Sequence, residues 1–445
     1  MNSSDSERVA SVLERIGYER AGTEREADML IFNTCQIKQK AEDKLYGLRK
    51  NLEKLHDENT RLKVAVTGCM VRDSSTRNAP KDHILKVMDE VDFVFRIEDV
   101  AKLPDLLREV DPALEFEDGI EDGTLENYFK INPKKTNNYS VFVPISQGCD
   151  KFCTYCIVPY TRGREASRDF DEIVAECAKH VDEGALEITL VGQTVNSYGL
   201  SFNDKKSGKF EKHGKNPFSA LLRAVDKLSA KGLSRLRFTS PHPRDFHDEL
   251  IQTMAELKTI CPYVHMPVQS GDDAVLRRMN RNYRTPEYKE IMNKLKKAIP
   301  NIAISTDIIV GFCGETEAEF HNTLNMYREM EWDFCYNNKY SSRKGTYAQK
   351  RLTDDVPPAV KTERWHSLNE VLKEISRKKH AAFIGKEVEV LVEQQIGQTC
   401  IGRSRENKEV TFKSGRKMAG KLANVRVTDS GTFQLRGELI SPQPP

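Results

Sequence analysis

The chain has 445 residues, of which 38% are hydrophobic and 31% charged, and its formal net charge is +2 at pH 7. This length exceeds one small domain, so we expect two or three globular domains. The near-neutral charge excludes a nonspecific polycation but not a nucleic-acid partner, because binding depends on where the charge lies. No run approaches the roughly 20 apolar residues of a membrane span, and the N-terminus does not resemble a signal peptide. We therefore expect a cytoplasmic protein with no membrane partner.

In the first 110 residues, short apolar runs alternate with helical patterns. A helix is predicted over residues 5–18, strands over 29–32 and 64–66, a helical stretch over 38–58 between them, and a further strand over 91–95. This order predicts a doubly wound α/β domain over residues 1–110, whose ligands bind at the carboxyl ends of its strands. Cys35 and Cys69 fall at those ends.

An acidic segment follows this domain. Residues 111–126 include seven Asp and Glu and no Lys or Arg. We interpret this acidic stretch as a solvated part of an inter-domain linker over residues 111–134, with an acidic interaction tail as the alternative.

Six strand-like runs then alternate with helical ones between residues 135 and 375. They lie at 141–145, 187–191, 235–239, 263–266, 302–310 and 334–336. Six βα units predict a partial parallel barrel, in which functional residues occupy the loops after the strands.

The last part of the chain has a different pattern. A charged helix is predicted over residues 360–379, and short alternating runs separated by glycines predict a small β-barrel over 380–442. From Lys379 onward there are 11 Lys and Arg against 7 Asp and Glu, so this tail is basic.

The 10 cysteines are too few for a disulfide scaffold, but three of them lie close together in the sequence. Cys149, Cys153 and Cys156 follow the first barrel strand. Three local thiolates leave one iron of a 4Fe-4S cluster without a protein ligand, and that iron can chelate S-adenosylmethionine and donate the electron that releases a 5′-deoxyadenosyl radical. A zinc site is the alternative, but the next candidate ligands, Cys177 and His180, fall in a predicted outer helix.

Loops on the same barrel face supply candidate residues for the S-adenosylmethionine pocket. Ordinary turns and loop hydrogen bonds are the alternative. These candidate cofactor-binding residues are Gly192, Gln193, Asn196, Gln269, Ser270, Asp307, Gly311 and Phe312. Arg162, just after the cysteines, is a candidate for binding a carboxylate or phosphate, with a solvated loop as the alternative.

The segment 147–163 (QGCDKFCTYCIVPYTRG) resembles the radical-SAM signature of the methylthiotransferase family, and most of all its tRNA-2-methylthio-N6-dimethylallyladenosine synthases (the MiaB type). The likeness extends to 190–193 (LVGQ), 238–243 (FTSPHP), 265–271 (HMPVQSG) and 309–316 (IVGFCGET). The C-terminal barrel resembles the TRAM RNA-binding domain.

This resemblance implies an enzyme with two 4Fe-4S clusters that uses two molecules of S-adenosylmethionine. The radical cluster is implied at Cys149, Cys153 and Cys156, and an auxiliary cluster at the N-terminal domain, with Cys35 and Cys69 among its ligands. The implied product is a 2-methylthio adenosine next to the anticodon, at position 37 of tRNA. We also expect a monomer that receives electrons from a donor such as flavodoxin or ferredoxin.

Basic residues suggest where the anticodon stem-loop of tRNA binds. Near residue 280 we expect phosphate contacts by arginines and base stacking by Tyr283, with an exposed helix end as the alternative. The barrel supplies further cations. The full set of RNA-binding candidates is Arg277, Arg278, Tyr283, Arg403, Arg405, Lys413, Arg416 and Lys417, with Lys408 as an additional one.

The N-terminus departs from the family pattern. Relatives begin with a strand and a turn whose cysteine is the first ligand of the auxiliary cluster, whereas this chain starts at residues that align just after it. We expect either a misassigned start or truncation, or a protein that lacks this ligand. In the second case the auxiliary cluster should be labile or absent, and about eight irons per chain after reconstitution would contradict that expectation.

Three other functions remain as alternatives. Within the family these are methylthiolation of threonylcarbamoyl-adenosine in tRNA and of an aspartate in a ribosomal protein. From a different class comes a zinc-containing RNA-binding protein without catalysis.

Overall fold

A computed structural model describes residues 2–34, 39–114, 128–131 and 137–442. The chain divides into two compact units. The first comprises Met1–Thr136 with Gln147–Phe152 and Cys156–Glu165, and the second comprises Asn137–Ser146, Cys153–Tyr155 and Ala166–Pro445. Within the described ranges, no helix is long and apolar enough to cross a membrane.

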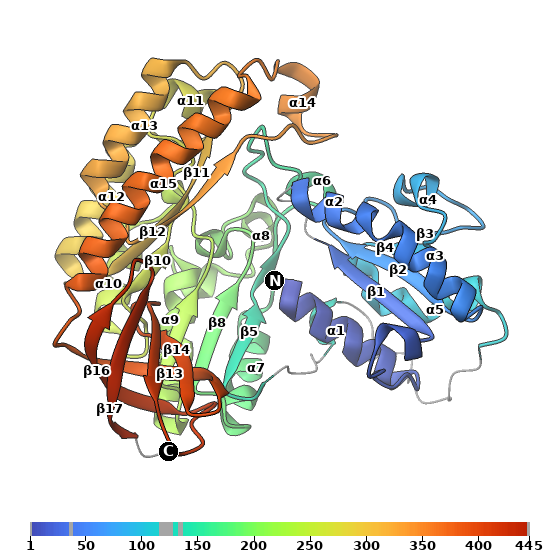
Figure 1. The fold of residues 1–445 in the computed structure, drawn as a ribbon, viewed down its shortest axis with the longest axis horizontal. Helices are drawn as coiled ribbons and strands as arrows, with labels where there is room; N and C mark the ends of the chain where they lie inside the picture. The colour runs from blue at the N-terminus through green and yellow to red at the C-terminus, as the bar shows by residue number, and fades with distance from the viewer. Residues whose placement is uncertain (1, 35–38, 115–127, 132–136, 443–445) are drawn as a thin grey trace. The chain divides into compact units, whose positions relative to one another are not determined.

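The first unit is built on a four-stranded sheet (Figure 1). Its strands are β1 (Met29–Thr34), β2 (Lys63–Gly68), β3 (Ser75–Thr76) and β4 (Phe93–Phe95), in the order β1-β2-β4-β3. β1, β2 and β4 are parallel, with Thr34 opposite Gly68, and β3 is antiparallel to β4. Its helices are α1 (Asn2–Arg15), α2 (Gln39–Gly47), α3 (Arg49–Glu58), α4 (Ile84–Val87) and α5 (Leu103–Val110), with α6 (Val158–Thr161) from the later segment.

Alternating side chains of β2 face two separate hydrophobic cores. Val64 and Val66 pack with residues of α3 and α4, whereas Ala65 packs with Val9 and Val12 of α1. Because strand side chains alternate between faces, helices cover both faces of this sheet. The predicted doubly wound α/β domain is confirmed.

The second unit contains six parallel strands in two three-stranded sheets. One sheet is β5 (Ser140–Pro144), β8 (Glu187–Val191) and β9 (Arg235–Phe238), and the other is β10 (Tyr263–His265), β11 (Ala303–Val310) and β12 (Phe334–Lys339). A parallel bridge between Leu236 and Ile260 links the end of one sheet to the start of the other. The six predicted strands of the partial barrel are therefore confirmed.

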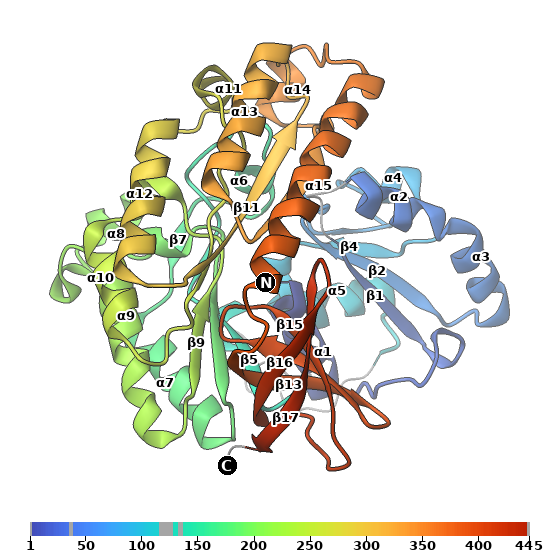
Figure 2. The same ribbon diagram turned by 60° about the vertical axis from the view of Figure 1, so that its left-hand side comes forward.

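Helices line the outside of these strands (Figures 1 and 2). They are α7 (Phe170–Asp182), α8 (Phe202–Ser207), α9 (Pro217–Asp226), α10 (Asp248–Glu256), α11 (Asp273–Arg278), α12 (Thr285–Ala298), α13 (Glu317–Met330), α14 (Tyr347–Arg351) and α15 (Pro358–Ala381). Two short strands, β6 (Ser146–Gln147) and β7 (Ala166–Ser167), form a ribbon of their own.

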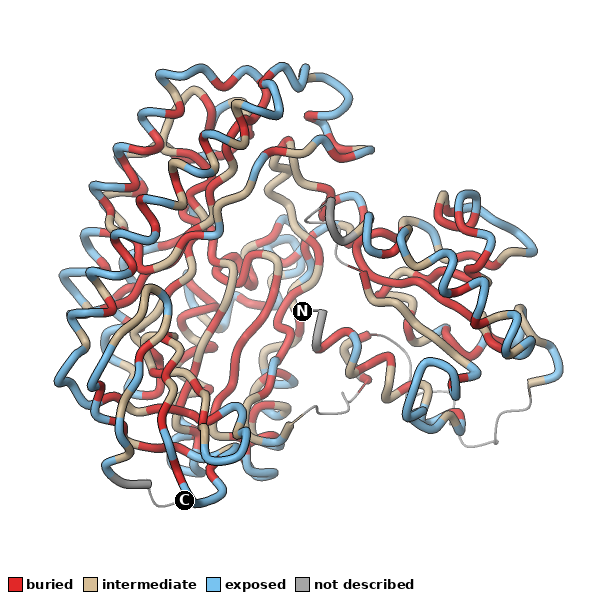
Figure 3. The backbone as a smooth tube through the Cα atoms, in the orientation of Figure 1, coloured by how far each residue is buried: buried red, intermediate tan, exposed pale blue. Residues whose placement is uncertain are grey.

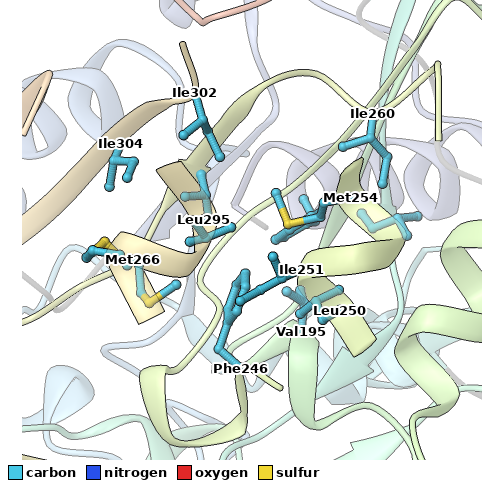
Figure 4. Close-up of a cluster of buried hydrophobic side chains, with 14 of the residues drawn as sticks. Val195, Phe246, Leu250, Ile251, Met254, Ile260, Met266, Leu295, Ile302 and Ile304 are labelled. Atoms are coloured by element: carbon cyan, nitrogen blue, oxygen red, sulfur yellow. The ribbon is translucent and has the colours of Figure 1, made fainter. Parts of the chain in front are cut away.

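The core of this unit lies between its strands and helices. In Figure 3 its strands are mostly buried, whereas its helices alternate between buried and exposed turns, as amphipathic helices do. Figure 4 shows part of this core, where Phe246, Leu250 and Met254 pack near Met266 and Leu295.

The C-terminal strands close into a five-stranded barrel below α15 (Figure 2). They are β13 (Glu387–Ile396), β14 (Thr399–Ser404), β15 (Glu409–Lys413), β16 (Leu422–Ser430) and β17 (Gln434–Pro442), in the order β13-β14-β15-β17-β16. Valines 388, 390, 392, 410, 425 and 427 fill its interior. The predicted small β-barrel is confirmed.

Buried arginines attach this barrel to the central sheet. Arg235 on β9 donates to the Glu389 carboxylate at 2.9 Å, the Glu389 carbonyl at 2.9 Å and the Arg403 carbonyl at 2.8 Å. Arg237 donates to the Arg405 and Ser404 carbonyls at 3.0 and 2.8 Å. The barrel and the partial barrel therefore form one compact unit.

Two residues near the end of the predicted linker are buried. Tyr128 and Ile131 are 3% and 1% exposed, and the Tyr128 hydroxyl donates to Asp5 at 2.5 Å, so this part packs into the first unit and is not solvated. The acidic residues 115–126 and residues 132–134 lie outside the described residues. The domain boundaries at 110, 135, 375, 380 and 442 stay predictions.

Candidate functional site

The three clustered cysteines lie on the loop between β6 and α6. None of the three is in a disulfide, and all three are partly exposed. Gly148, just before Cys149, has a φ of +73°, and a Cβ there would lie 2.2 Å from the Arg164 carbonyl oxygen. The Cys149 N–H donates to the Gly163 carbonyl at 3.2 Å. Only glycine permits this close return of the chain, which shapes the loop around its thiols.

The middle of the loop is held by the second unit. Thr154 donates its N–H to the Met279 carbonyl at 3.0 Å and its hydroxyl to the Arg278 carbonyl at 2.9 Å. The Ala348 N–H donates to the Thr154 carbonyl at 2.8 Å. These bonds fix the backbone directly after Cys153.

A buried guanidinium contacts one of the three sulfurs. Arg281 is 6% exposed and its Nη1 lies 3.4 Å from the Cys153 Sγ. An arginine stays charged in proteins and donates hydrogen bonds in a fixed planar geometry. The donor set therefore suits a 4Fe-4S cluster bound through three cysteine thiolates.

The further ligands of the zinc alternative are buried in a helix. Cys177 and His180 lie on α7 and are 0% and 4% exposed. Cys177 is fully buried in the core, and burial raises its thiol pKa far above the ordinary value. It is therefore a small hydrophobic core residue.

Cys69 occupies a second buried site in the first unit. It follows Gly68, which has a φ of +94°, and its N–H donates to the Thr34 carbonyl at 2.9 Å. Cys35 follows Thr34 in the sequence, and Thr34 pairs with Gly68 across the sheet. Cys35 itself lies outside the described residues.

Arg162 binds this site from the segment after the clustered cysteines. Its Nε donates to the Cys69 Sγ at 3.4 Å, and its Nη2 donates to the Asp5 carboxylate at 2.7 Å. The other Asp5 oxygen accepts the Tyr128 hydroxyl. Arg162 is 3% exposed, so the solvated-loop interpretation is wrong, whereas the prediction that it binds a carboxylate is met by Asp5 of the protein itself.

At two of the predicted pocket positions, neighbouring atoms lie so close that only glycine fits. A Cβ on Gly192 would lie 2.5 Å from the Ser146 hydroxyl oxygen. Gly311 has a φ of +69°, and a Cβ there would lie 2.3 Å from the Lys361 Cγ. Gln193 is partly exposed beside Gly192. Their contact with a cofactor stays a prediction.

Three other candidates hold protein loops. The Asn196 amide donates to the His242 carbonyl at 2.9 Å and accepts the His242 N–H at 2.7 Å, and Asn196 is 1% exposed. Ser270 is fully buried and its hydroxyl accepts the Asp272 N–H at 3.2 Å. The Phe312 ring is also fully buried, edge-on to Tyr155. Their side chains are held in the protein interior, and their contact with a cofactor stays a prediction.

A polar chain that was missed from the sequence crosses β10 and β11. His265 lies 2.8 Å from the Ser305 hydroxyl and 3.1 Å from the Asp307 carboxylate, and Ser305 lies 2.7 Å from the Tyr263 hydroxyl. Gln269, which has a φ of +71°, pairs with Ile308 next to Asp307. The available signal was the alternation of polar residues on two neighbouring strands, which places them on one face. Cofactor contacts of Asp307 and Gln269 stay predictions.

The RNA candidates near residue 280 divide into exposed and buried ones. Arg277 is exposed. Arg278 forms a bidentate ion pair with the Glu319 carboxylate, with N···O distances of 2.9 and 2.7 Å. Tyr283 is 3% exposed and its hydroxyl donates to the Val268 carbonyl at 2.7 Å. The predicted stacking of Tyr283 on a base is wrong, because its ring is packed in the protein core.

The barrel candidates divide in the same way. Arg405 donates to the Ser234, Lys258 and Ile260 carbonyls at 3.1, 2.7 and 3.1 Å, so it anchors the barrel and its prediction as an RNA contact is wrong. Lys408 is 5% exposed and pairs with Asp333 at 2.6 Å, which is a second correction.

The remaining barrel cations are at least partly accessible. Lys413, Arg416 and Lys417 are exposed, and Arg403 is partly exposed. Lys413 and Arg416 flank the turn between β15 and β16. Their contact with RNA stays a prediction.

Comparisons with known proteins identify the family. The family described as "Radical SAM superfamily" matches residues 143–327, and "Uncharacterized protein family UPF0004" matches residues 1–96. A tRNA-2-methylthio-N(6)-dimethylallyladenosine synthase of Bacillus licheniformis is 40% identical over 446 residues, covering 99% of this chain and 84% of the relative. The corresponding synthase of Clostridium botulinum (strain Okra / Type B1) is 41% identical, covering 99% and 95%.

The chain belongs to the tRNA-2-methylthio-N(6)-dimethylallyladenosine synthase family.

Membership of this synthase family tests the predictions of enzyme class and cofactors and the zinc-protein alternative. The chain is a radical-SAM methylthiotransferase with S-adenosylmethionine and a 4Fe-4S cluster as cofactors. The alternative of a non-catalytic zinc protein is therefore wrong. Among solved structures, a radical S-adenosylmethionine methyltransferase from Kitasatospora setae with cobalamin and a [4Fe-4S] cluster shares the fold at 13% identity, with a TM-score of 0.52 over 75% of this chain and 71% of that one.

Proposed function

We propose that this synthase-family member adds a methylthio group to C2 of N6-isopentenyladenosine at position 37 of tRNA, next to the anticodon. The proposal rests on the sequence identity of 40–41% to named synthases over 99% of the chain. The three-cysteine loop lies inside the radical-SAM match, where this chemistry requires it.

The chemistry follows from the strength of the bond to be broken. C2–H of adenine is unactivated, so its replacement requires a radical, and the cluster with S-adenosylmethionine supplies that radical when bound. The residues of this chain provide the frame: Gly148 shapes the loop, Thr154 fixes its middle, and Arg281 donates to Cys153. Cys69, with its buried partner Arg162, lies in the domain where the resemblance implies the auxiliary cluster.

The RNA-binding proposal rests on exposed cations of the C-terminal barrel. Lys413, Arg416 and Lys417 lie around one turn, and Arg416 and Lys417 have no ion-pair partner among the described residues. Unpaired surface cations are the groups that contact RNA phosphates. We place the anticodon stem-loop against this turn, with Arg277 and Arg278 as further candidate contacts.

The cellular setting follows from this substrate. The enzyme acts in the cytoplasm, where tRNA is modified. Reduction of the radical cluster requires a one-electron donor of low potential, and a flavodoxin or ferredoxin belongs to that class.

Product analysis distinguishes the target from the two alternatives within the family. The anaerobically reconstituted enzyme is incubated with S-adenosylmethionine, a reductant and three substrates in parallel: stem-loop RNA with N6-isopentenyladenosine, stem-loop RNA with threonylcarbamoyl-adenosine, and ribosomal protein. Mass spectrometry should find methylthiolation of the first RNA alone, and none with the Cys149→Ala variant. Product from either other substrate, without product from the first, would contradict the proposal.

A further inference from the structure

Arg281 lies in the turn after α11, and each of its three guanidinium nitrogens donates a hydrogen bond. Its Nη1 donates to the Cys153 Sγ at 3.4 Å, its Nε to the Tyr283 hydroxyl at 3.0 Å and its Nη2 to the Pro267 carbonyl at 2.9 Å. The Tyr283 hydroxyl in turn donates to the Val268 carbonyl at 2.7 Å. These residues all belong to the second unit. The guanidinium is therefore held in one orientation toward the sulfur.

The charge of Arg281 has no carboxylate partner. It is 6% exposed, and within the described part of the chain no Asp or Glu lies within ion-pair distance of it. A buried, unpaired cation is costly, so such sites normally contain an anion. The sulfur of Cys153 is the anionic group available, and it carries negative charge as a ligand of the cluster. The pocket around Arg281 is thus built to face an iron-bound thiolate.

We propose that Arg281 is a positioning residue of the radical cluster, which orients the Cys153 thiolate and raises the reduction potential of the cluster. This inference rests on the proposed function, because it requires the cluster at Cys149, Cys153 and Cys156. Reduction adds one electron and one negative charge to the cluster. A fixed cation and an N–H···S hydrogen bond stabilise that added charge, so they favour the reduced state. The electron comes from a low-potential donor protein, or from dithionite in vitro.

The contact acts on Cys153 together with the backbone that follows it. Cys153 receives a charged donor from Arg281. The adjacent Thr154 is bonded to Met279 and Arg278, the residues just before Arg281. One short segment, 278–281, therefore fixes both the backbone and the sulfur at this point of the loop.

The test measures the potential of the cluster, not only turnover. Arg281→Lys keeps the positive charge but loses the planar guanidinium with its fixed donors, and Arg281→Met removes both the charge and the donors. Arg223→Met removes an exposed arginine of α9 that pairs with Glu249 and Glu256, and it serves as the matched control. All variants are made in full-length Cys69→Ala protein, so that an auxiliary cluster does not contribute to the signal.

Redox titration followed by electron paramagnetic resonance gives the readout. We expect the midpoint potential to shift to more negative values in Arg281→Met, by a smaller amount in Arg281→Lys, and not at all in Arg223→Met. Reductive cleavage of S-adenosylmethionine should fall about tenfold in Arg281→Met, with KM within about twofold. Iron bound after dialysis should also decrease.

Wild-type potential and spectrum in Arg281→Met would overturn the proposal. If Arg281→Met does not fold, Arg281→Lys decides: a negative shift supports the proposal, and an unchanged potential overturns it. None of these measurements uses RNA. Failure of the proposed function, seen as absence of methylthiolated product, is therefore distinguished from failure of this inference.

Discussion

Replacement of Arg235 by methionine should destabilise the second unit strongly. The side chain is fully buried and holds the Glu389 carboxylate and two barrel carbonyls, those of Glu389 and Arg403. Methionine fills much of the volume but leaves these acceptors without donors. Breaking one side of a buried ion pair costs about 3–5 kcal/mol, and each orphaned carbonyl about 1–3 kcal/mol. Arg405, 3.8 Å from Glu389, compensates in part, so we expect a net loss of about 3–5 kcal/mol.

Urea unfolding monitored by tryptophan fluorescence measures this loss. The chain has two tryptophans, Trp332 and Trp365, and both belong to the second unit. The signal therefore reports the unit that Arg235 stabilises. At a slope of about 3 kcal/mol per molar urea, the midpoint should fall by about 1 M or more.

Arg426→Met provides the matched control. Arg426 also lies in the barrel and pairs with Glu387 at 2.7 Å, but both side chains are more than half exposed. Exposed pairs contribute about 0–1 kcal/mol, so this variant should unfold near the wild-type midpoint. If Arg235→Met lost no more stability than Arg426→Met, the reasoning about the buried attachment of the barrel would be refuted.

Three further predictions concern acidity, backbone and RNA. Burial, and to a smaller extent Lys408, lower the pKa of His380 to about 4, so the unfolded chain takes up a proton before the folded chain as pH falls below 6.5. The free energy of unfolding in urea titrations should therefore fall by about 2 kcal/mol between pH 7 and pH 5. His380→Gln should flatten this pH dependence. Gly311→Ala should lower the thermal midpoint more than Gly184→Ala, because both have positive φ but a Cβ meets neighbouring atoms only at Gly311; equal losses would refute the packing argument. Lys417→Glu should weaken RNA binding and reduce the salt slope by about 1 in a binding titration, and an unchanged slope would remove this residue from the interface.

Most of the fold could be predicted from the sequence because its signals are local. The strand at 187–191 shows as a mostly apolar run followed by Gly192, and the strand at 235–238 alternates arginines with apolar residues before Ser240 and Pro241. Strands β3, β6 and β7 were missed because each is only two residues long, and the individual strands β14 and β17 are hard to recognise because they are rich in polar residues. Their pairing depends on the rest of the barrel and not on their own pattern.

The site could be predicted only in part, for a related reason. The cysteine triplet lies within eight residues, so its spacing is visible. The partners that fix it are distant: Arg281 is 128 positions from Cys153, and Arg162 is 93 positions from Cys69. The sequence does not distinguish a basic side chain that binds RNA from one that binds the protein itself. For Arg405, only the fold shows that it binds the protein.

The central claim is that the enzyme methylthiolates isopentenyladenosine in tRNA. The most direct measurement is mass spectrometry of nucleosides from the tRNA of cells in which this gene has been deleted. The account predicts loss of 2-methylthio-N6-isopentenyladenosine and accumulation of N6-isopentenyladenosine, both reversed by the wild-type gene but not by Cys149→Ala. An unchanged level of 2-methylthio-N6-isopentenyladenosine after deletion would contradict it.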